Sequence, residues 1–215
     1  MKNFSIAEAV KFGWRQAIDN SGFFVVFLTL YLIIDLVNNG LTMVTESMAL
    51  LLFFFVSSLI IDTFAGIVFT STALRVLRGE RAHFDHLFAN VEYFWRYLWG
   101  SVLYTLIVLG GLLLLVAPGV IWGLRFSFYS YFIIDQKMTA MEALKDSNRL
   151  TAGKTVDLIG LSFIMLFLLI GGFLALIVGL YIAIPLVMLA NAHVYQQLVG
   201  ASHQQATKSA KPRRR

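Results

Sequence analysis

Apolar residues along this chain occur in long, almost uncharged runs instead of alternating with polar ones. Six runs have roughly the length that a helix needs to cross about 30 Å of hydrocarbon at about 1.5 Å per residue. They are Phe23–Asn38, Ala49–Leu74, Tyr97–Val116, Pro118–Ile134, Val156–Leu174 and Ala175–Gln196. A lipid-facing β-barrel would alternate apolar and polar positions, and these runs do not alternate. The pattern therefore predicts an all-α membrane protein with six transmembrane helices.

Two of the connections between these runs are short enough to be tight turns. Ala117, Pro118 and Gly119 divide the third run from the fourth, where proline can begin a helix and glycine can turn the chain. The fifth and sixth runs continue without a charged residue from Leu158 to Ala190, which is too long for one crossing, so we expect a turn within Gly171–Gly179. The sequence thus predicts two helical hairpins.

Amphipathic segments precede the hairpins and give the chain an internal repeat. Ser5 with Glu8 and Thr139 with Glu142 are spaced as capping boxes, so each pair is expected to begin an interfacial helix. A third such helix is expected in residues 84–95. We predict three pseudo-repeats of interfacial helix plus hairpin, at about 5–78, 82–135 and 139–199, packed as a compact six-helix bundle. Residues 1–199 form the membrane domain, and 200–215 a disordered basic cytoplasmic tail.

Composition and charge agree with a membrane and indicate an orientation. Hydrophobic residues make up 59% of the chain and charged residues 13%, against roughly 45–50% and about 25% in soluble proteins. Of the 17 Lys and Arg residues, 16 lie at the termini or in the connections after the second and fourth runs. Because short cytoplasmic loops retain cations, both termini are predicted to be cytoplasmic. The net charge of +5 is spread along one membrane side, so no nucleic acid partner is expected.

The remaining cation, Arg125, lies inside the fourth run and is the unusual residue of this sequence. A charge at that depth costs about 2.5–3.5 kcal/mol on insertion scales, so it needs a partner or a water-filled recess. Asp62 lies at a similar depth in the second run, and Asp35 in the first is the alternative carboxylate. We predict an Arg125–Asp62 pair. It is either part of a polar cavity for an anionic ligand or a closed salt bridge that fixes helix register.

Most of the sequence, from the opening EAV-K-GW segment to Pro185 in the sixth run, resembles a known family. The stretch from Ala117 to Lys154, with a Pro-Gly turn, an arginine in an aromatic-rich helix and an EAL-K-S segment that ends in glycine, is similar to a superfamily of bacterial integral membrane proteins. That superfamily includes the membrane domain fused to some glycerophosphodiester phosphodiesterases. The matching residues are Pro118, Gly119, Arg125, Glu142, Ala143, Leu144, Lys145, Ser147 and Gly153. The resemblance implies a bacterial cytoplasmic membrane, and lipid metabolism by association only.

Candidate chemistry is sparse. The chain has no cysteine, which excludes disulfides and thiolate sites, and it carries no nucleophile elbow, phosphate loop or zinc-protease motif. We therefore expect no catalytic residue, no metal and no cofactor. The predicted function is a non-catalytic accessory or lipid-associated module of the cytoplasmic (inner) cell membrane. Its expected partners are membrane lipids and another membrane protein or a second copy. The alternatives are a transporter component with a polar cavity around Arg125 and Asp62, and, third, a membrane enzyme.

Overall fold

The protein is all-α in the part of the chain that its structure describes. This structure is a computed structural model covering residues 4–175 and 179–210, with side chains for 4–175 and 179–202. The α-helices in chain order are α1 (Ile6–Asp19), α2 (Ser21–Val44), α3 (Met48–Leu77), α4 (Phe94–Leu114), α5 (Val116–Phe126), α6 (Tyr129–Asp135), α7 (Ala140–Thr151), α8 (Thr155–Leu174) and α9 (Leu180–Ala210). Two 3₁₀ turns, η1 (Phe84–His86) and η2 (Val91–Tyr93), precede α4. The predicted fold class is thus confirmed at the all-α level.

Five helical segments among the described residues are long and apolar enough to cross a membrane. They are Ser21–Val44, Met48–Leu77, Phe84–Leu114, Thr155–Leu174 and Leu180–Ser202. The predicted fourth span, Pro118–Ile134, is instead divided between α5 and α6, with Ser127 and Phe128 between them. At 1.5 Å per residue, α5 is about 17 Å long and α6 about 11 Å, so neither crosses about 30 Å of hydrocarbon alone. The prediction of six single-helix spans is therefore wrong at this one position.

The segments before the hairpins also differ from one another. The first and third predicted amphipathic helices are present as α1 and α7, whereas residues 84–93 form only the two 3₁₀ turns. A 3₁₀ turn also places residues three apart on one side, so the apolar spacing of this segment does not require an α-helix. The predicted interfacial helix in residues 84–95 is therefore wrong. The first and third units keep the expected order of amphipathic helix and hairpin, and the middle unit does not.

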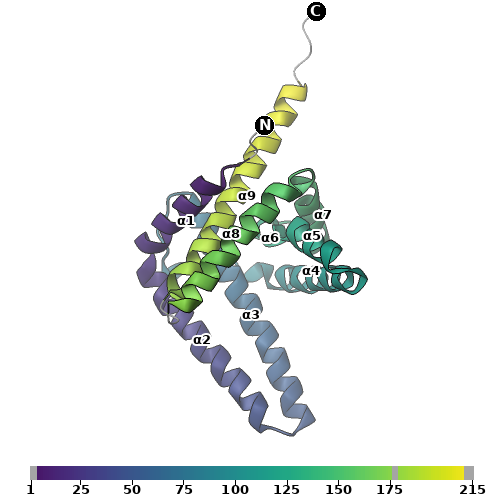
Figure 1. Ribbon diagram of the computed structural model, residues 1–215. Coiled ribbons are helices and arrows are strands. Elements are labelled where there is room, and N and C mark those ends of the chain that lie inside the picture. The colour runs from purple at the N-terminus through teal and green to yellow at the C-terminus, as the bar shows by residue number, and fades with distance from the viewer. Residues whose placement is uncertain (1–3, 176–178, 211–215) are drawn as a thin grey trace, which may run out of the picture.

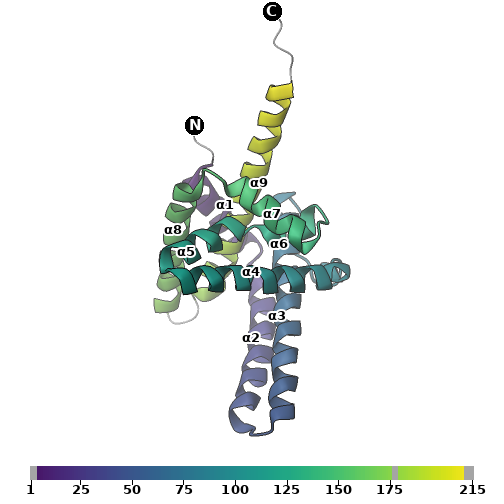
Figure 2. The same cartoon turned by 90° about the vertical axis from the view of Figure 1, so that its right-hand side faces the viewer.

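The helical hairpins point in different directions. The α2–α3 hairpin projects from the rest of the molecule, while α4 runs across its base (Figures 1 and 2). In the third pair, α8 and α9 lie side by side and antiparallel, with Pro185 inside α9 (Figure 1). The helices therefore do not form the compact bundle that the sequence suggested. The start of α1 and the end of α9 lie at the end of the molecule away from the α2–α3 turn (Figure 2).

The core lies where the C-terminal half of α3, α6 and α9 meet. Ile67, Ile133 and Leu189 are each 0% exposed. At the rim of this core, Asp135 accepts hydrogen bonds from Arg78 (2.7 Å) and from the hydroxyl of Tyr195 (3.1 Å). One carboxylate thereby joins the ends of α3 and α6 to the middle of α9.

The C-terminal helix is longer than the sequence suggested. α9 continues to Ala210 and so includes the first part of the predicted disordered tail, 200–210. Residues 211–215 of that tail lie outside the described residues. α8 ends at Leu174 and α9 begins at Leu180, which agrees with the turn expected within Gly171–Gly179. Residues 176–178 of that turn also lie outside the described residues.

Candidate functional site

The break between α5 and α6 is held by two hydroxyl groups of α7. The carbonyl oxygen of Arg125 accepts hydrogen bonds from Ser147 Oγ (2.9 Å) and Thr151 Oγ1 (3.0 Å). The N–H of Phe128 donates to Ser147 Oγ at 3.1 Å. Both α7 residues are 0% exposed, and their i, i+4 spacing places them on one face of that helix. Non-helical backbone in an apolar surrounding is tolerated where neighbouring side chains satisfy it in this way.

Arg125 is not paired with a carboxylate. Its Nε is buried and has no hydrogen-bond partner. Among the described residues the ion pairs are Arg75–Glu80, Arg78–Asp135 and Arg149–Asp146. The predicted pair of Arg125 with Asp62 is therefore not formed, and neither is the alternative with Asp35. Arg125 lies in the last turn of α5, where a positive charge interacts favourably with the negative end of the helix dipole.

The two carboxylates of the α2–α3 hairpin have partners of their own. Asp62 Oδ1 accepts a hydrogen bond from the hydroxyl of Tyr31 at 2.9 Å. Asp35 Oδ1 accepts one from Asn39 Nδ2, also at 2.9 Å, one turn further along α2. Counting residues along a helix gives the depth of a carboxylate in the membrane but not its hydrogen-bond partner. Here Tyr31 and Asn39, from the same hairpin, bind the carboxylates that were expected to bind Arg125.

A polar network also fastens α2 to α3. Asn38 is 8% exposed and donates through Nδ2 to Ser58 Oγ (2.7 Å) and to the carbonyl of Phe54 (3.2 Å). Ser57 Oγ donates in turn to Asn38 Oδ1. Such polar side chains join helices that have apolar surroundings on their other faces. Ser57 and Ser58 therefore hold the hairpin together.

The predicted helix caps begin α1 and α7. Ser5 Oγ accepts a hydrogen bond from the N–H of Glu8 at 3.4 Å. Thr139 and Glu142 form the complete capping box, in which the Glu142 carboxylate accepts from the Thr139 N–H (3.0 Å) and hydroxyl (2.7 Å). These hydrogen bonds from Thr139 hold the pKa of Glu142 below its ordinary value. All four residues thus lie at the starts of helices. Glu8 also lines a surface hollow next to α1.

Close packing of α1 on α9 creates that hollow. Ala9 and Ala17 are 0% and 3% exposed, and with Gly13 between them they form a stripe of small residues, one per turn. A Cβ added at Gly13 would lie 2.5 Å from the carbonyl oxygen of Leu186 in α9. Glycine is therefore required at this position by the close approach of the two helices. Trp14 and Ile18, on the adjoining face, remain 52% and 47% exposed.

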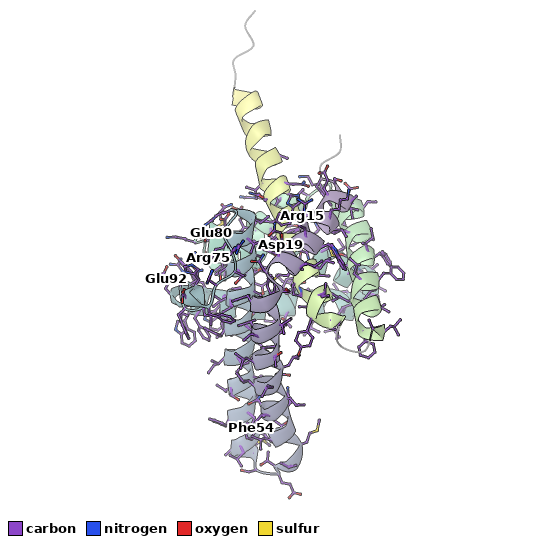
Figure 3. All side chains as sticks on the ribbon, turned by 90° about the vertical axis from the view of Figure 1, so that its left-hand side faces the viewer. Arg15, Asp19, Phe54, Arg75, Glu80 and Glu92 are labelled. Atoms are coloured by element: carbon purple, nitrogen blue, oxygen red, sulfur yellow. The ribbon has the colours of Figure 1, made fainter. Side chains whose placement is uncertain are left out.

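The α1 hollow is an open cavity of about 600 Å³ beside this contact. Its walls carry one acidic, two basic and two aromatic side chains together with an amide and an imidazole: Glu8, Lys11, Phe12, Trp14, Arg15, Gln16 and His193. His193 stacks on Phe12 with ring centroids 4.6 Å apart, and its Nε2 lies 3.0 Å from Gln197 Nε2. Figure 3 labels Arg15 on α1, near the charged residues at the base of the α2–α3 hairpin.

The sequence alone does not reveal this hollow. Lys11 and Arg15 are among the cations that indicate the orientation, and His193 lies almost 180 residues further along the chain. The signal that could have found it is the i, i+4 pair of cations on an amphipathic helix, next to a tryptophan on the same helix. The position of α9 comes from tertiary packing alone.

Comparison with known proteins adds no function. No family model, no curated protein and no solved structure matches this chain. The resemblance to the bacterial membrane protein superfamily therefore stays a prediction.

Proposed function

We propose that this chain is a non-catalytic, multi-pass protein of the bacterial cytoplasmic membrane that acts as a lipid-associated accessory module. One observation carries the proposal, namely the large apolar side chains on the outward faces of the long helices. Leu113 on α4 is 88% exposed, Met43 on α2 is 86% exposed and Leu174 on α8 is 74% exposed. In water each square ångström of this surface would cost about 25 cal/mol, whereas lipid tails cover it without that cost.

The separation of charged and apolar regions supports a membrane orientation. Phe54 lies on the projecting part of the α2–α3 hairpin, whereas Arg15, Arg75 and Glu80 gather at its base (Figure 3). The start of α1 and the end of α9 are also away from the hairpin turn (Figure 2). We therefore propose that the α2–α3 turn, with Glu46, faces the outside and that the charged base faces the cytoplasm, as the distribution of cations suggests.

No observation favours the alternative of a transporter. That function would need a water-accessible polar cavity around Arg125 and Asp62. The two side chains do not pair, Asp62 is hydrogen-bonded to Tyr31, and the α1 hollow is lined by other residues. The polar side chains of the α2–α3 hairpin are hydrogen-bonded to one another, and Ser147 and Thr151 bind the backbone at the helix break, as expected of a module that packs and holds lipid.

Membrane extraction tests this proposal. Membranes from cells that express the chain are washed with alkaline carbonate and high salt and then treated with detergent. We expect the protein to stay in the membrane pellet until detergent is added. Reporter fusions at Glu46 and Arg215 should report opposite sides, and native mass spectrometry of the extracted protein should detect retained phospholipid. A protein that remains monomeric in plain buffer, without detergent, would contradict the proposal.

A further inference from the structure

We propose that the α1 hollow binds the headgroup of an anionic phospholipid and that an adjoining apolar groove holds one of its acyl chains. This inference rests on the proposed function and names the ligand class of one site. It follows from two cavities that share one side chain, Trp14.

The adjoining cavity, here the α8 groove, has the character of an acyl-chain site. Its volume is about 280 Å³, and its walls include Trp14, Phe167, Gly171, Ile182 and Leu186. These residues come from α1, α8 and α9, and none of them has a charged side chain. An ion or a sugar would lose its hydration in this groove without gaining a hydrogen-bond partner. A hydrocarbon chain would instead contact apolar side chains.

The charges of the α1 hollow fit a phosphate. Lys11 and Arg15 are one helical turn apart on the exposed side of α1, and neither belongs to an ion pair among the described residues. Two cations at this spacing repel each other, so an anion placed between them removes a repulsion and gains two charge-assisted hydrogen bonds. Glu8 is the acidic side chain of the walls, which leaves the hollow with a net positive charge.

The distance between the two cavities matches one lipid molecule. His193 marks the hollow on α9, and Leu186 and Ile182 of the groove lie 7 and 11 residues before it. At 1.5 Å per residue these separations are about 11 Å and about 17 Å. About 15 Å is half of the hydrocarbon thickness, so the groove extends from the leaflet whose headgroups reach Lys11 and Arg15 to about the middle of the bilayer.

Trp14 joins the two halves. It is 52% exposed and lines both the hollow and the groove. Tryptophan prefers the boundary between headgroups and acyl chains, because its ring is apolar and its N–H is polar. A free phosphate would use the cations but not the groove. The shared tryptophan therefore favours a phospholipid over a soluble phosphate.

A lipid-binding titration with two pairs of matched variants tests the site. The detergent-solubilised protein is titrated with phosphatidylglycerol or with phosphatidylcholine, and bound lipid is counted by native mass spectrometry. The headgroup variant is K11A/R15A, and its control R81A/K145A removes the same charge from exposed positions elsewhere. We expect the headgroup variant to bind phosphatidylglycerol about tenfold more weakly than the control, because each cation near a membrane surface contributes to the attraction.

The groove is tested by G171L, with G40L as control. A Cβ added at either glycine meets nothing within 4 Å, so both leucines can be accommodated, and of the two positions only residue 171 lines the α8 groove. We expect G171L to weaken phosphatidylglycerol binding and G40L to leave it unchanged. Inorganic phosphate should compete weakly and equally in both variants. Circular dichroism confirms that each variant is folded.

Several results would overturn this inference and leave the proposed function standing. Equal phosphatidylglycerol binding by K11A/R15A and its control would remove the headgroup site. Inorganic phosphate that binds as tightly as the lipid would make the hollow a soluble-anion site, and unchanged binding by G171L would remove the acyl-chain half. Carbonate extraction of the same variants separates the two proposals, because a protein that leaves the membrane refutes the proposed function itself.

Discussion

Replacement of Ser147 by alanine tests whether α7 holds the break between α5 and α6. The hydroxyl of Ser147 makes two hydrogen bonds there, to the Arg125 carbonyl and from the Phe128 N–H, and Phe128 is 2% exposed. Without it the Phe128 N–H loses its partner, and a buried unsatisfied donor costs about 1–3 kcal/mol. The Arg125 carbonyl keeps Thr151 as a donor. We therefore expect S147A to lower the free energy of unfolding by about 2–3 kcal/mol.

The matched control is T151V, which also removes a buried hydroxyl from the same face of α7. Thr151 donates to the Arg125 carbonyl, but that oxygen retains Ser147, and valine preserves the shape of the side chain. No N–H depends on Thr151, so the expected cost is about 1 kcal/mol. The assay is reversible unfolding in detergent micelles, with hydrogen exchange at the Phe128 amide. The reasoning fails if T151V costs more than S147A, or if the Phe128 amide remains protected in S147A.

Three further predictions concern packing, the hairpin and pH. G13A should destabilise the protein by about 1–3 kcal/mol, because the added methyl group meets a carbonyl of α9, whereas G22A, which meets nothing, should be neutral or stabilising in the same thermal melts. N38A should cost about 1–2 kcal/mol, since membrane hydrogen bonds contribute about 0.6 kcal/mol each and three are lost; a melt unchanged from wild type would contradict the network. Because Thr139 lowers the pKa of Glu142, the carboxylate stabilises the fold above its ordinary pKa of 4.5, and this stabilisation is lost as the pH falls from 4.5 through the lowered value. E142Q should remove that part of the acid transition, and an identical pH profile for the variant would refute the assignment.

Features fixed by local sequence could be predicted, and features fixed by packing could not. The long spans and the caps at Ser5 and Thr139 depend on residues within a few positions of one another. The turn expected at Ala117, Pro118 and Gly119 lies instead at Leu115, and those three residues belong to the first turns of α5. The break at Ser127 could not be predicted, because apolar residues lie on both sides of it. The hydroxyl groups that satisfy its backbone come from α7, about 20 residues further along. Apolar periodicity likewise does not distinguish the 3₁₀ turns at 84–93 from an α-helix.

In the candidate site, too, the features fixed by local sequence could be predicted and those fixed by packing could not. Arg125 could be recognised as an unusual intramembrane cation from sequence, but its surroundings could not. The rise per residue gives the depth of Asp62 in the membrane but not the rotation or tilt of its helix. It therefore placed Asp62 at the depth of Arg125 without showing that the Asp62 carboxylate is hydrogen-bonded to Tyr31. The α1 hollow needed the contact between α1 and α9, which joins the two ends of the chain. Only the small residues Ala9, Gly13 and Ala17 point to that contact from sequence.

The break between α5 and α6 also imposes an order on biosynthesis. Residues 127 and 128 leave the ribosome before Ser147 and Thr151, whose hydroxyls complete the hydrogen bonding of the break. Helices α3 and α4, which also pack against α5 and α6, are made earlier. The shape of this region is therefore completed by partners from both sides of it in the chain.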